Sequence, residues 1–223
     1  FLSAAPGVLK NDTRIYAATE GTLAGSTAPP PPPAGLPAPW LHADIGNVGV
    51  QGDTSYDEAS GTFTVAGAGA DIWGTADALH YAYQTLSGDG SIVARVTSVS
   101  NTHAWVKAGV MFRESLDPVS AQATMLVSYG KGLAFQRRTA TGGTSTSTAG
   151  ALAGAPYFVR LDRVGSIISA YQSTDGVSWT LVGTDTISMT GTVYVGLAVS
   201  SHTTTAAATA TFDRIALSTP TGG

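Results

Sequence analysis

Hydrophobic and polar residues alternate along short segments of this chain, and this alternation limits what the chain can fold into. In segment 91–99, Ile92, Ala94 and Val96 alternate with Arg95 and Thr97, which is the period of a strand with one buried face. Segment 104–114 repeats the pattern, and the breaks at 88–90 and 175–176 contain the glycine and aspartate of tight turns. Apolar residues nowhere keep a helical period of 3.6 for three turns. The pattern therefore predicts strands and excludes a helix bundle.

Further strand candidates follow at spacings of about 8–12 residues. They are the segments 62–66, 79–86, 121–129, 132–138, 157–164, 166–173, 177–183, 193–200 and 206–217. Many short strands joined by glycine-rich turns are typical of a two-sheet antiparallel sandwich or a barrel. The sequence therefore predicts an all-β fold of one of these two architectures.

Composition excludes several classes of function. Lys and Arg number 11 against 15 Asp and Glu, a net charge of −4, so the basic excess of a nucleic-acid-binding protein is missing. Cysteine is absent, which excludes disulfides, cysteine-ligated zinc and thiol nucleophiles. No apolar run approaches the roughly 20 residues that a membrane span needs, so no membrane-spanning segment is expected. Few lysines, many threonines and a proline-rich spacer favour a secreted or cell-surface protein.

Four segments are distinguished along the chain. Residues 29–39 contain five consecutive prolines, which favour a stiff polyproline II spacer. We therefore expect an extended N-terminal arm at 1–28, a Pro-rich linker at 29–39, the β-sandwich at 40–218 and a C-terminal tail at 219–223.

Several sequence blocks resemble a known family. They read DIWG at 71–74, WVKAGVMFRE at 105–114, RLDR at 160–163 and VGLAVSSH at 195–202. In this order they are similar to concanavalin A-like (laminin-G/jelly-roll) domains of the regulation-of-enolase type, found in large secreted bacterial proteins. The resemblance covers about residues 43–217 and implies a two-sheet antiparallel jelly-roll sandwich. It implies an accessory module beside glycoside hydrolases or adhesion repeats, and no activity.

Residues for catalysis are sparse. A glycosidase needs two carboxyl groups on either side of the scissile bond, yet the three glutamates, Glu20, Glu58 and Glu114, are far apart in the sequence. The histidines at 42, 80, 103 and 202 show no metal-ligand or triad spacing. We therefore expect that the protein is not an enzyme.

A binding surface is the leading hypothesis. Sugars bind where an aromatic ring stacks on the C–H face of the sugar and planar polar side chains hold its hydroxyls. The alternation places several polar side chains opposite the apolar set, and neighbouring strands would gather them beside Trp105 or Trp73. The candidate ligand-binding residues are Arg95, Trp105, Lys107, Arg113, Gln136 and Arg138. The function expected is non-catalytic extracellular recognition or adhesion through glycans, and the alternative is a solvated sheet face without a ligand. For Trp73 and Trp179, packing is expected.

A structural Ca²⁺ ion is a further possibility, because carboxylates in loops are hard-cation ligands. The candidates are Asp44, Asp53, Asp57, Asp71, Asp77 and Asp213, although the sequence contains no D-x-D-x-D-G loop that would assign them.

The N-terminal arm suggests an alternative function. An extended apolar segment on a spacer could add a strand to the open sheet edge of another subunit. Repeated head to tail, this exchange would build an extracellular filament. The arm residues that would make the contact are Val8, Leu9, Ile15 and Tyr16.

Overall fold

The computed structural model describes residues 35–219, and every regular element in this range is a strand. Within the range no helix is long and apolar enough to cross a membrane. The expected arm at 1–28, most of the linker, residues 220–223 of the tail, and with them Val8, Leu9, Ile15 and Tyr16 lie outside the described residues. The strands are β1 (Leu41–Ile45), β2 (Asp53–Asp57), β3 (Thr62–Gly69), β4 (Ile72–Trp73), β5 (Ala76–Asp77), β6 (Leu79–Ser87), β7 (Gly90–Val99), β8 (Lys107–Arg113), β9 (Gln122–Ser128), β10 (Leu133–Arg138), β11 (Thr146–Ala149), β12 (Tyr157–Val164), β13 (Ile167–Ser173), β14 (Thr180–Thr186), β15 (Thr192–Ser200) and β16 (Thr203–Ser218).

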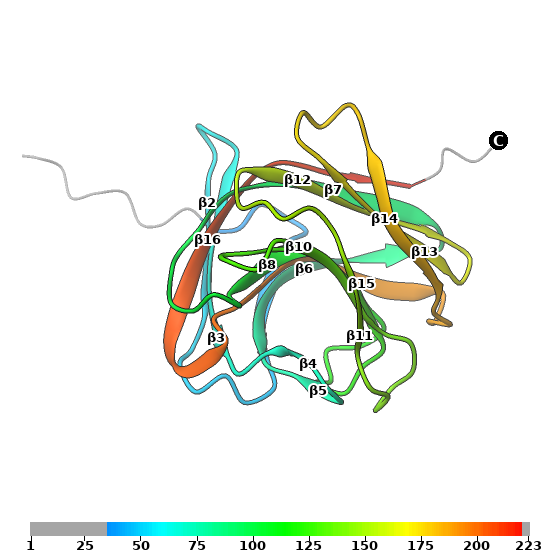
Figure 1. The fold of residues 1–223 in the computed structure, drawn as a ribbon, viewed down its shortest axis with the longest axis horizontal. Coiled ribbons are helices and arrows are strands. Elements are labelled where there is room, and N and C mark those ends of the chain that lie inside the picture. The colour runs from blue at the N-terminus through cyan, green and yellow to red at the C-terminus, as the bar shows by residue number, and fades with distance from the viewer. Residues whose placement is uncertain (1–34, 220–223) are drawn as a thin grey trace, which may run out of the picture. The chain divides into compact units, whose positions relative to one another are not determined.

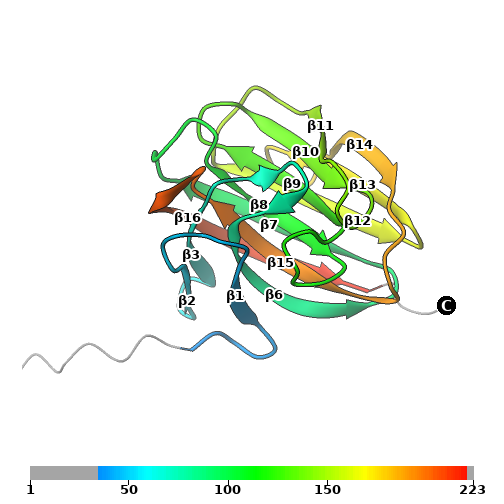
Figure 2. The same ribbon diagram turned by 90° about the horizontal axis from the view of Figure 1, so that it is seen from below.

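Two seven-stranded antiparallel sheets form the sandwich (Figure 1, Figure 2). Sheet I has the strand order β1-β6-β15-β8-β9-β10-β11, and sheet II has the order β14-β13-β12-β7-β16-β3-β2. The prediction of a two-sheet antiparallel jelly-roll sandwich is confirmed. The short β4–β5 hairpin lies on the side of sheet I that faces away from sheet II (Figure 1).

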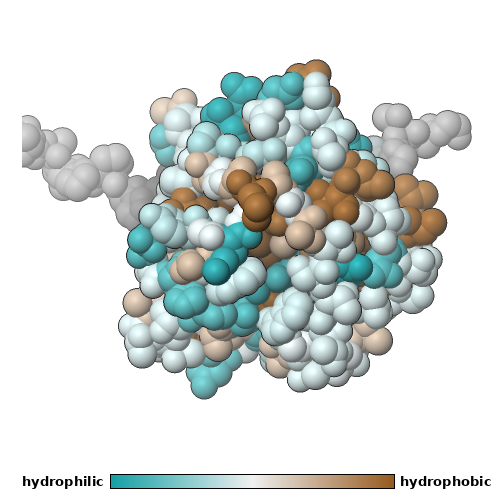
Figure 3. Space-filling view, in the orientation of Figure 1, coloured by the Kyte–Doolittle hydropathy of each residue, from teal (hydrophilic) through white to brown (hydrophobic). Residues whose placement is uncertain are grey.

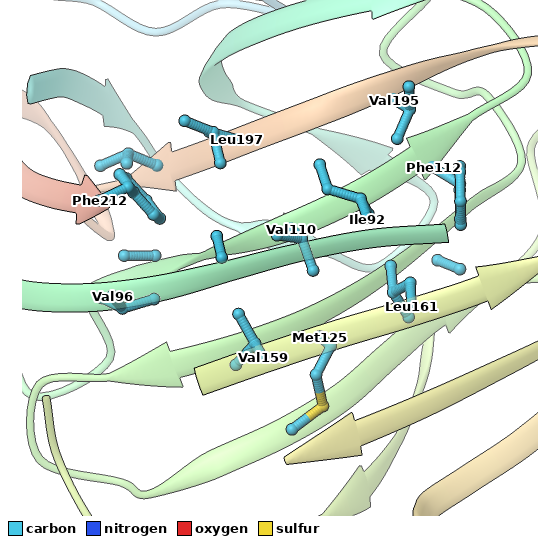
Figure 4. Packing of buried hydrophobic residues seen from close by; sticks show 14 of the residues in the cluster. Ile92, Val96, Val110, Phe112, Met125, Val159, Leu161, Val195, Leu197 and Phe212 are labelled. Carbon is cyan, nitrogen blue, oxygen red and sulfur yellow. The ribbon is translucent and has the colours of Figure 1, made fainter. Parts of the chain in front are cut away.

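The main core lies between the two sheets, where the alternation in the sequence predicts it. Ile92 and Val96 of β7 and Val110 and Phe112 of β8 belong to one cluster of buried side chains (Figure 4). All four side chains are fully buried. On the face shown in Figure 3, the apolar surface that remains is gathered toward the side where β13 and β14 lie.

One prediction about β8 was wrong. Alternation suggested that its second face, with Lys107, Met111 and Arg113, is solvated, but all seven residues of the strand are buried. The β4–β5 hairpin covers this outer face, and a second, smaller core of Ile45, Ile72, Leu79, Tyr81, Tyr83, Met111 and Ala198 fills the space beneath it. The alternation of apolar and polar residues along a strand does not predict whether a hairpin from elsewhere in the chain covers its outer face.

Two glycines allow close strand packing on this outer face. A Cβ at Gly196 of β15 would lie 2.7 Å from the Cα of Tyr83, and one at Gly109 of β8 would lie 2.6 Å from the Cα of Leu126. In both cases the obstacle is the backbone of the neighbouring strand, which cannot move aside as a flexible side chain can. Side chains are therefore excluded at these two positions of the outer face.

A buried histidine joins the two sheets at one edge. The imidazole Nδ1 of His80, on β6, lies 2.7 Å from Asp44 Oδ1, and its Nε2 lies 3.0 Å from Thr54 Oγ1 on β2. The ring of His42 also approaches, with its Nδ1 3.1 Å from His80 Nε2. Burial lowers the pKa of His80 below its usual value, and the neighbouring Asp44 carboxylate opposes this shift only in part.

This lowered pKa predicts a stability that depends on pH. Below about pH 6.5 the unfolded chain takes up a proton at residue 80 more readily than the folded chain, so the free energy of unfolding should fall as the pH is lowered from 7.5 to 5.5. Denaturant unfolding at a series of pH values measures this decrease. In a His80→Gln variant the dependence over this range should be weaker, and an equal slope in both proteins would contradict the assignment to His80.

Candidate functional site

A hollow of about 250 Å³ opens on the outer face of sheet I, between the sheet and the β4–β5 hairpin. Strands β8, β10 and β11 provide its floor, and the hairpin and two connecting segments provide its walls. The residues that line it are Asp71, Trp73, Trp105, Lys107, Gln136, Ser147 and His202.

Lys107 lies in the floor of this hollow and contacts three polar groups. Its ammonium donates to Gln136 Oε1 at 2.9 Å and to the carbonyl oxygen of Ile72 at 3.2 Å, and it forms an ion pair with Asp71 Oδ1 at 2.5 Å. An ammonium has three hydrogens to donate, and these three acceptors use all of them. Lys107 therefore holds Asp71 and Gln136 in place and has no hydrogen left for a ligand.

Burial also affects the charge of this lysine. Its side chain is 2% exposed, and desolvation lowers the pKa of Lys107 from its usual value, while the nearby Asp71 carboxylate favours the charged form. Asp71 is partly exposed, and its second oxygen, Oδ2, is directed toward His202. The charges of the ion pair cancel. The polar atoms of the floor that Lys107 does not occupy are Asp71 Oδ2, the Gln136 amide nitrogen and the Ser147 hydroxyl.

Two indole rings line the hollow. Trp73 is 40% exposed and Trp105 is 37% exposed, and the Lys107 ammonium lies over both rings, 5.6 Å and 5.9 Å from their centroids. The expectation that Trp73 only packs was wrong, because the β4–β5 hairpin presents its ring to the hollow. Exposed indoles beside polar groups provide the apolar and hydrogen-bonding parts of a sugar site.

His202 completes the lining from the turn between β15 and β16. It has a positive φ of 60°, which is uncommon for a residue other than glycine, and its ring stacks on His103 with centroids 4.4 Å apart. Its Nδ1 lies 3.4 Å from Asp71 Oδ2, but the geometry forms no hydrogen bond, and this buried atom has no other partner among residues 35–219.

A buried ionic network fixes the β4–β5 hairpin against the sheet. Arg138 donates to both oxygens of Asp77, at 2.6 Å and 2.9 Å, and to the carbonyl oxygens of Trp73 and Gly74 at 3.3 Å. Arg113 donates to Asp77 Oδ2 at 2.7 Å. All three charged side chains are fully buried. The network therefore sets the position of the Trp73 backbone.

The structure brings together three of the six residues predicted for binding. Trp105, Lys107 and Gln136 line one hollow. Arg113 and Arg138 share the same face of sheet I, but the expectation that they are exposed was wrong, because they lie under the hairpin with Asp77. They can position the site but cannot touch a ligand.

Arg95 does not belong to this hollow, and its grouping with the others was wrong. It lies on β7 in sheet II, where it pairs with Asp213 and lies over the ring of Phe158. Single-strand alternation shows which residues share a face of one strand, but it does not show which strands share a sheet.

Five of the six aspartates considered for calcium, all except Asp53, have other partners. Asp44 contacts His80, Asp71 contacts Lys107, and Asp77 and Asp213 pair with arginines. Asp57 caps a turn by accepting from Ser60 and from the amide of Ala59. In the described part of the chain, no three histidine, aspartate or glutamate side chains are grouped as metal ligands.

Asp71, Ser147 and His202 were not among the predicted ligand-binding residues. Asp71 and His202 lie in two of the sequence blocks that carry the family resemblance, which was a usable signal. No signal in the sequence pointed to Ser147, because its strand β11 was not predicted. Ser147 reaches the site through the pairing of β11 with β10, where it lies opposite Gln136.

Comparison with known proteins supports the fold. No protein-family model and no curated protein matches the sequence. Among solved structures, the chain is similar to a functionally unknown protein from Saccharomyces cerevisiae, with 17% identity and a TM-score of 0.62, over 82% of this chain and 96% of that one. It is also similar to the carbohydrate-binding module CBM66 from Bacillus subtilis, with 15% identity and a TM-score of 0.51, over 81% of this chain and 95% of that one.

A glycoside hydrolase contains the same architecture. The GH43 protein BlXynB from Bacillus licheniformis is 16% identical with a TM-score of 0.57, over 74% of this chain and 34% of the hydrolase. The chain thus spans about a third of the length of that enzyme. At these identities the likeness establishes the fold, a β-sandwich of the concanavalin-like, jelly-roll kind.

Proposed function

We propose that this chain is a non-catalytic carbohydrate-binding module that holds a neutral sugar unit in the hollow between Trp73 and Trp105. The observation that carries the proposal is the pairing of two half-exposed indoles with the Asp71–Lys107–Gln136 floor. The fold that the chain shares with a module named as carbohydrate-binding is consistent with it.

The chemistry of the floor favours a neutral sugar over an acidic one. The hydrogens of Lys107, the only lysine or arginine among the described residues that line the hollow, are all used within the protein. Asp71 Oδ2 can accept hydrogen bonds from sugar hydroxyls, whereas the carboxylate of a uronic acid would find no free lysine or arginine hydrogen here. The Gln136 amide and the Ser147 hydroxyl can donate to further sugar oxygens.

Binding without catalysis follows from the count of acidic groups. Glycoside hydrolysis uses two carboxyl groups, one on each side of the scissile bond. Of the described residues that line the hollow, only Asp71 carries a carboxyl group. We propose further that the protein works outside the cell, in recognition or adhesion at a glycan surface. The resemblance of its sequence blocks to accessory modules of large secreted bacterial proteins supports the location.

A glycan array tests the proposal. It should carry neutral oligosaccharides, including xylans, glucans and mannans, beside uronic acid polymers, and the protein should bind neutral members only. A Trp105→Ala variant should lose at least about tenfold in affinity, or about 1.4 kcal/mol, because a buried aromatic contact is a typical binding hot spot. Trp179→Ala is the matched control, since Trp179 packs against Phe158 of sheet II. Failure of the wild-type protein to bind any glycan would refute the proposal.

A further inference from the structure

A second hollow lies directly beyond Trp105. It is lined by Tyr129, Gly130, Lys131, Gly132, Leu152, Ala153 and Gly154. The Lys131 ammonium lies over the Trp105 ring, 5.8 Å from its centroid, so a residue that lines this hollow lies next to one that lines the first. The two hollows are therefore neighbours, and we call the Lys131 and Trp105 side chains between them the Trp105–Lys131 wall.

The second hollow presents apolar surface to solvent. Tyr129 is 45% exposed and Leu152 is 95% exposed. A leucine this exposed beside an exposed aromatic ring is unfavourable for the isolated domain, because each keeps apolar area in water. Tyrosine adds a flat ring and a hydroxyl, the combination that sugar surfaces contact.

Hydrogen bonds fix the turn that carries Tyr129 and Lys131. The Ser128 hydroxyl donates to the carbonyl oxygen of Gly132 and accepts from the amide of Lys131, both at 2.8 Å. The same turn is bonded to the segment that carries Trp105, because Tyr129 N donates to Val106 O at 3.1 Å and Gly130 N donates to Ala104 O at 2.9 Å. The backbone segments that carry Tyr129, Lys131 and Trp105 are therefore joined to one another.

The loop that carries Leu152 is also fixed. The amide of Ala151 donates to Gln172 Oε1 at 2.9 Å, and the carbonyl oxygen of Ala151 accepts from the amide of Leu133 at 2.8 Å. The backbone is thus fixed at the residue before Leu152, whose side chain is exposed. A preformed surface pays less ordering entropy when a ligand binds than a mobile one does.

From this continuity we infer that the hollow at Tyr129 and Leu152 is a second sugar subsite, and that the ligand is an oligosaccharide of at least two units crossing the Trp105–Lys131 wall. This inference rests on the proposed function of the first hollow. Trp105 contacts the unit in the first hollow, Tyr129 and Leu152 contact the next unit, and Lys131 donates to oxygens between them.

The test compares affinity with ligand length. Calorimetric titration uses β-1,4-linked xylose, glucose and mannose series, each from one to six units, against the wild-type chain. Affinity in the series that binds should rise at least about tenfold between one unit and three. Tyr129→Ala and Leu152→Ser should remove most of that rise and leave binding of the single unit unchanged. Val177→Ser, which changes an exposed apolar residue on the β13–β14 turn, should alter neither quantity.

The outcomes separate the two proposals. An affinity independent of length, or a rise that both Tyr129→Ala and Leu152→Ser retain, would overturn the second subsite while leaving the first intact. Wild-type protein that binds no member of any series and no glycan on the array would overturn both. Both substituted side chains are exposed, so the variants should unfold at the wild-type temperature, and thermal unfolding checks this.

Discussion

Asp77→Asn should lower the free energy of unfolding by about 3–5 kcal/mol, because it removes the carboxylate that compensates two fully buried arginines. Arg113 and Arg138 also donate to carbonyl oxygens of the 115–120 loop, at distances from 2.7 to 3.2 Å, but those acceptors carry no full charge. Chemical denaturation of the two proteins measures the difference. The asparagine keeps the size of the side chain, so the loss reports charge and not a cavity.

The control for this change is Asp213→Asn. Asp213 pairs with Arg95 on sheet II, where the arginine is about a third exposed and water can replace its partner. Exposed ion pairs contribute about 0–1 kcal/mol, so the control should be near wild type. An equal decrease in the free energy of unfolding in the two variants would show that burial does not determine how much the Asp77 network contributes to stability.

Lys107→Met should reduce glycan affinity by about 2 kcal/mol or more, roughly thirtyfold, although Lys107 itself has no hydrogen for the ligand. Without the ammonium, Asp71 and Gln136 lose the group that fixes their directions. The same change should cost about 1.5–3 kcal/mol of stability, because a hydrogen bond to a charged partner is lost in the interior.

Arg137→Met provides the matched control for Lys107. This arginine pairs with Asp185 of β14 at 2.8 Å, on β10 next to Gln136 but outside the hollow, so its loss should leave affinity unchanged. An indirect role for Lys107 also predicts partial recovery by Lys107→Arg, which keeps the charge and the donors. A Lys107→Met protein with wild-type affinity would contradict the positioning role.

The sequence predicts the main core well and the outer face of sheet I poorly. Ile92, Val96, Val110 and Phe112 are buried where the period of two places them, because a strand in a sandwich turns alternate residues inward. The face with Lys107 is different, since its environment is set by a hairpin 34 residues earlier in the chain, at Trp73. No local pattern contains that contact.

The candidate site could be predicted only in part for the same reason. Trp105, Lys107 and Gln136 were identifiable as an aromatic residue and polar residues opposite an apolar set. Arg113 and Arg138 have the same local pattern, yet they are buried by Asp77, and Arg95 belongs to the other sheet. Which sheet a strand joins and what covers it are long-range properties, and a single sequence without relatives does not encode them in any short window.

The walls and the floor of the first hollow come from different parts of the architecture. The floor residues Lys107 and Gln136 sit on paired strands, whereas Trp73 and Trp105 sit on a hairpin and a connecting segment outside the main core. Exchange of Trp105, an exposed residue of the β7–β8 connection, for another residue should therefore alter ligand preference while the scaffold between the sheets keeps its melting temperature. Because stability and ligand contact depend on different segments, this sandwich is a suitable scaffold for engineering new ligand specificities.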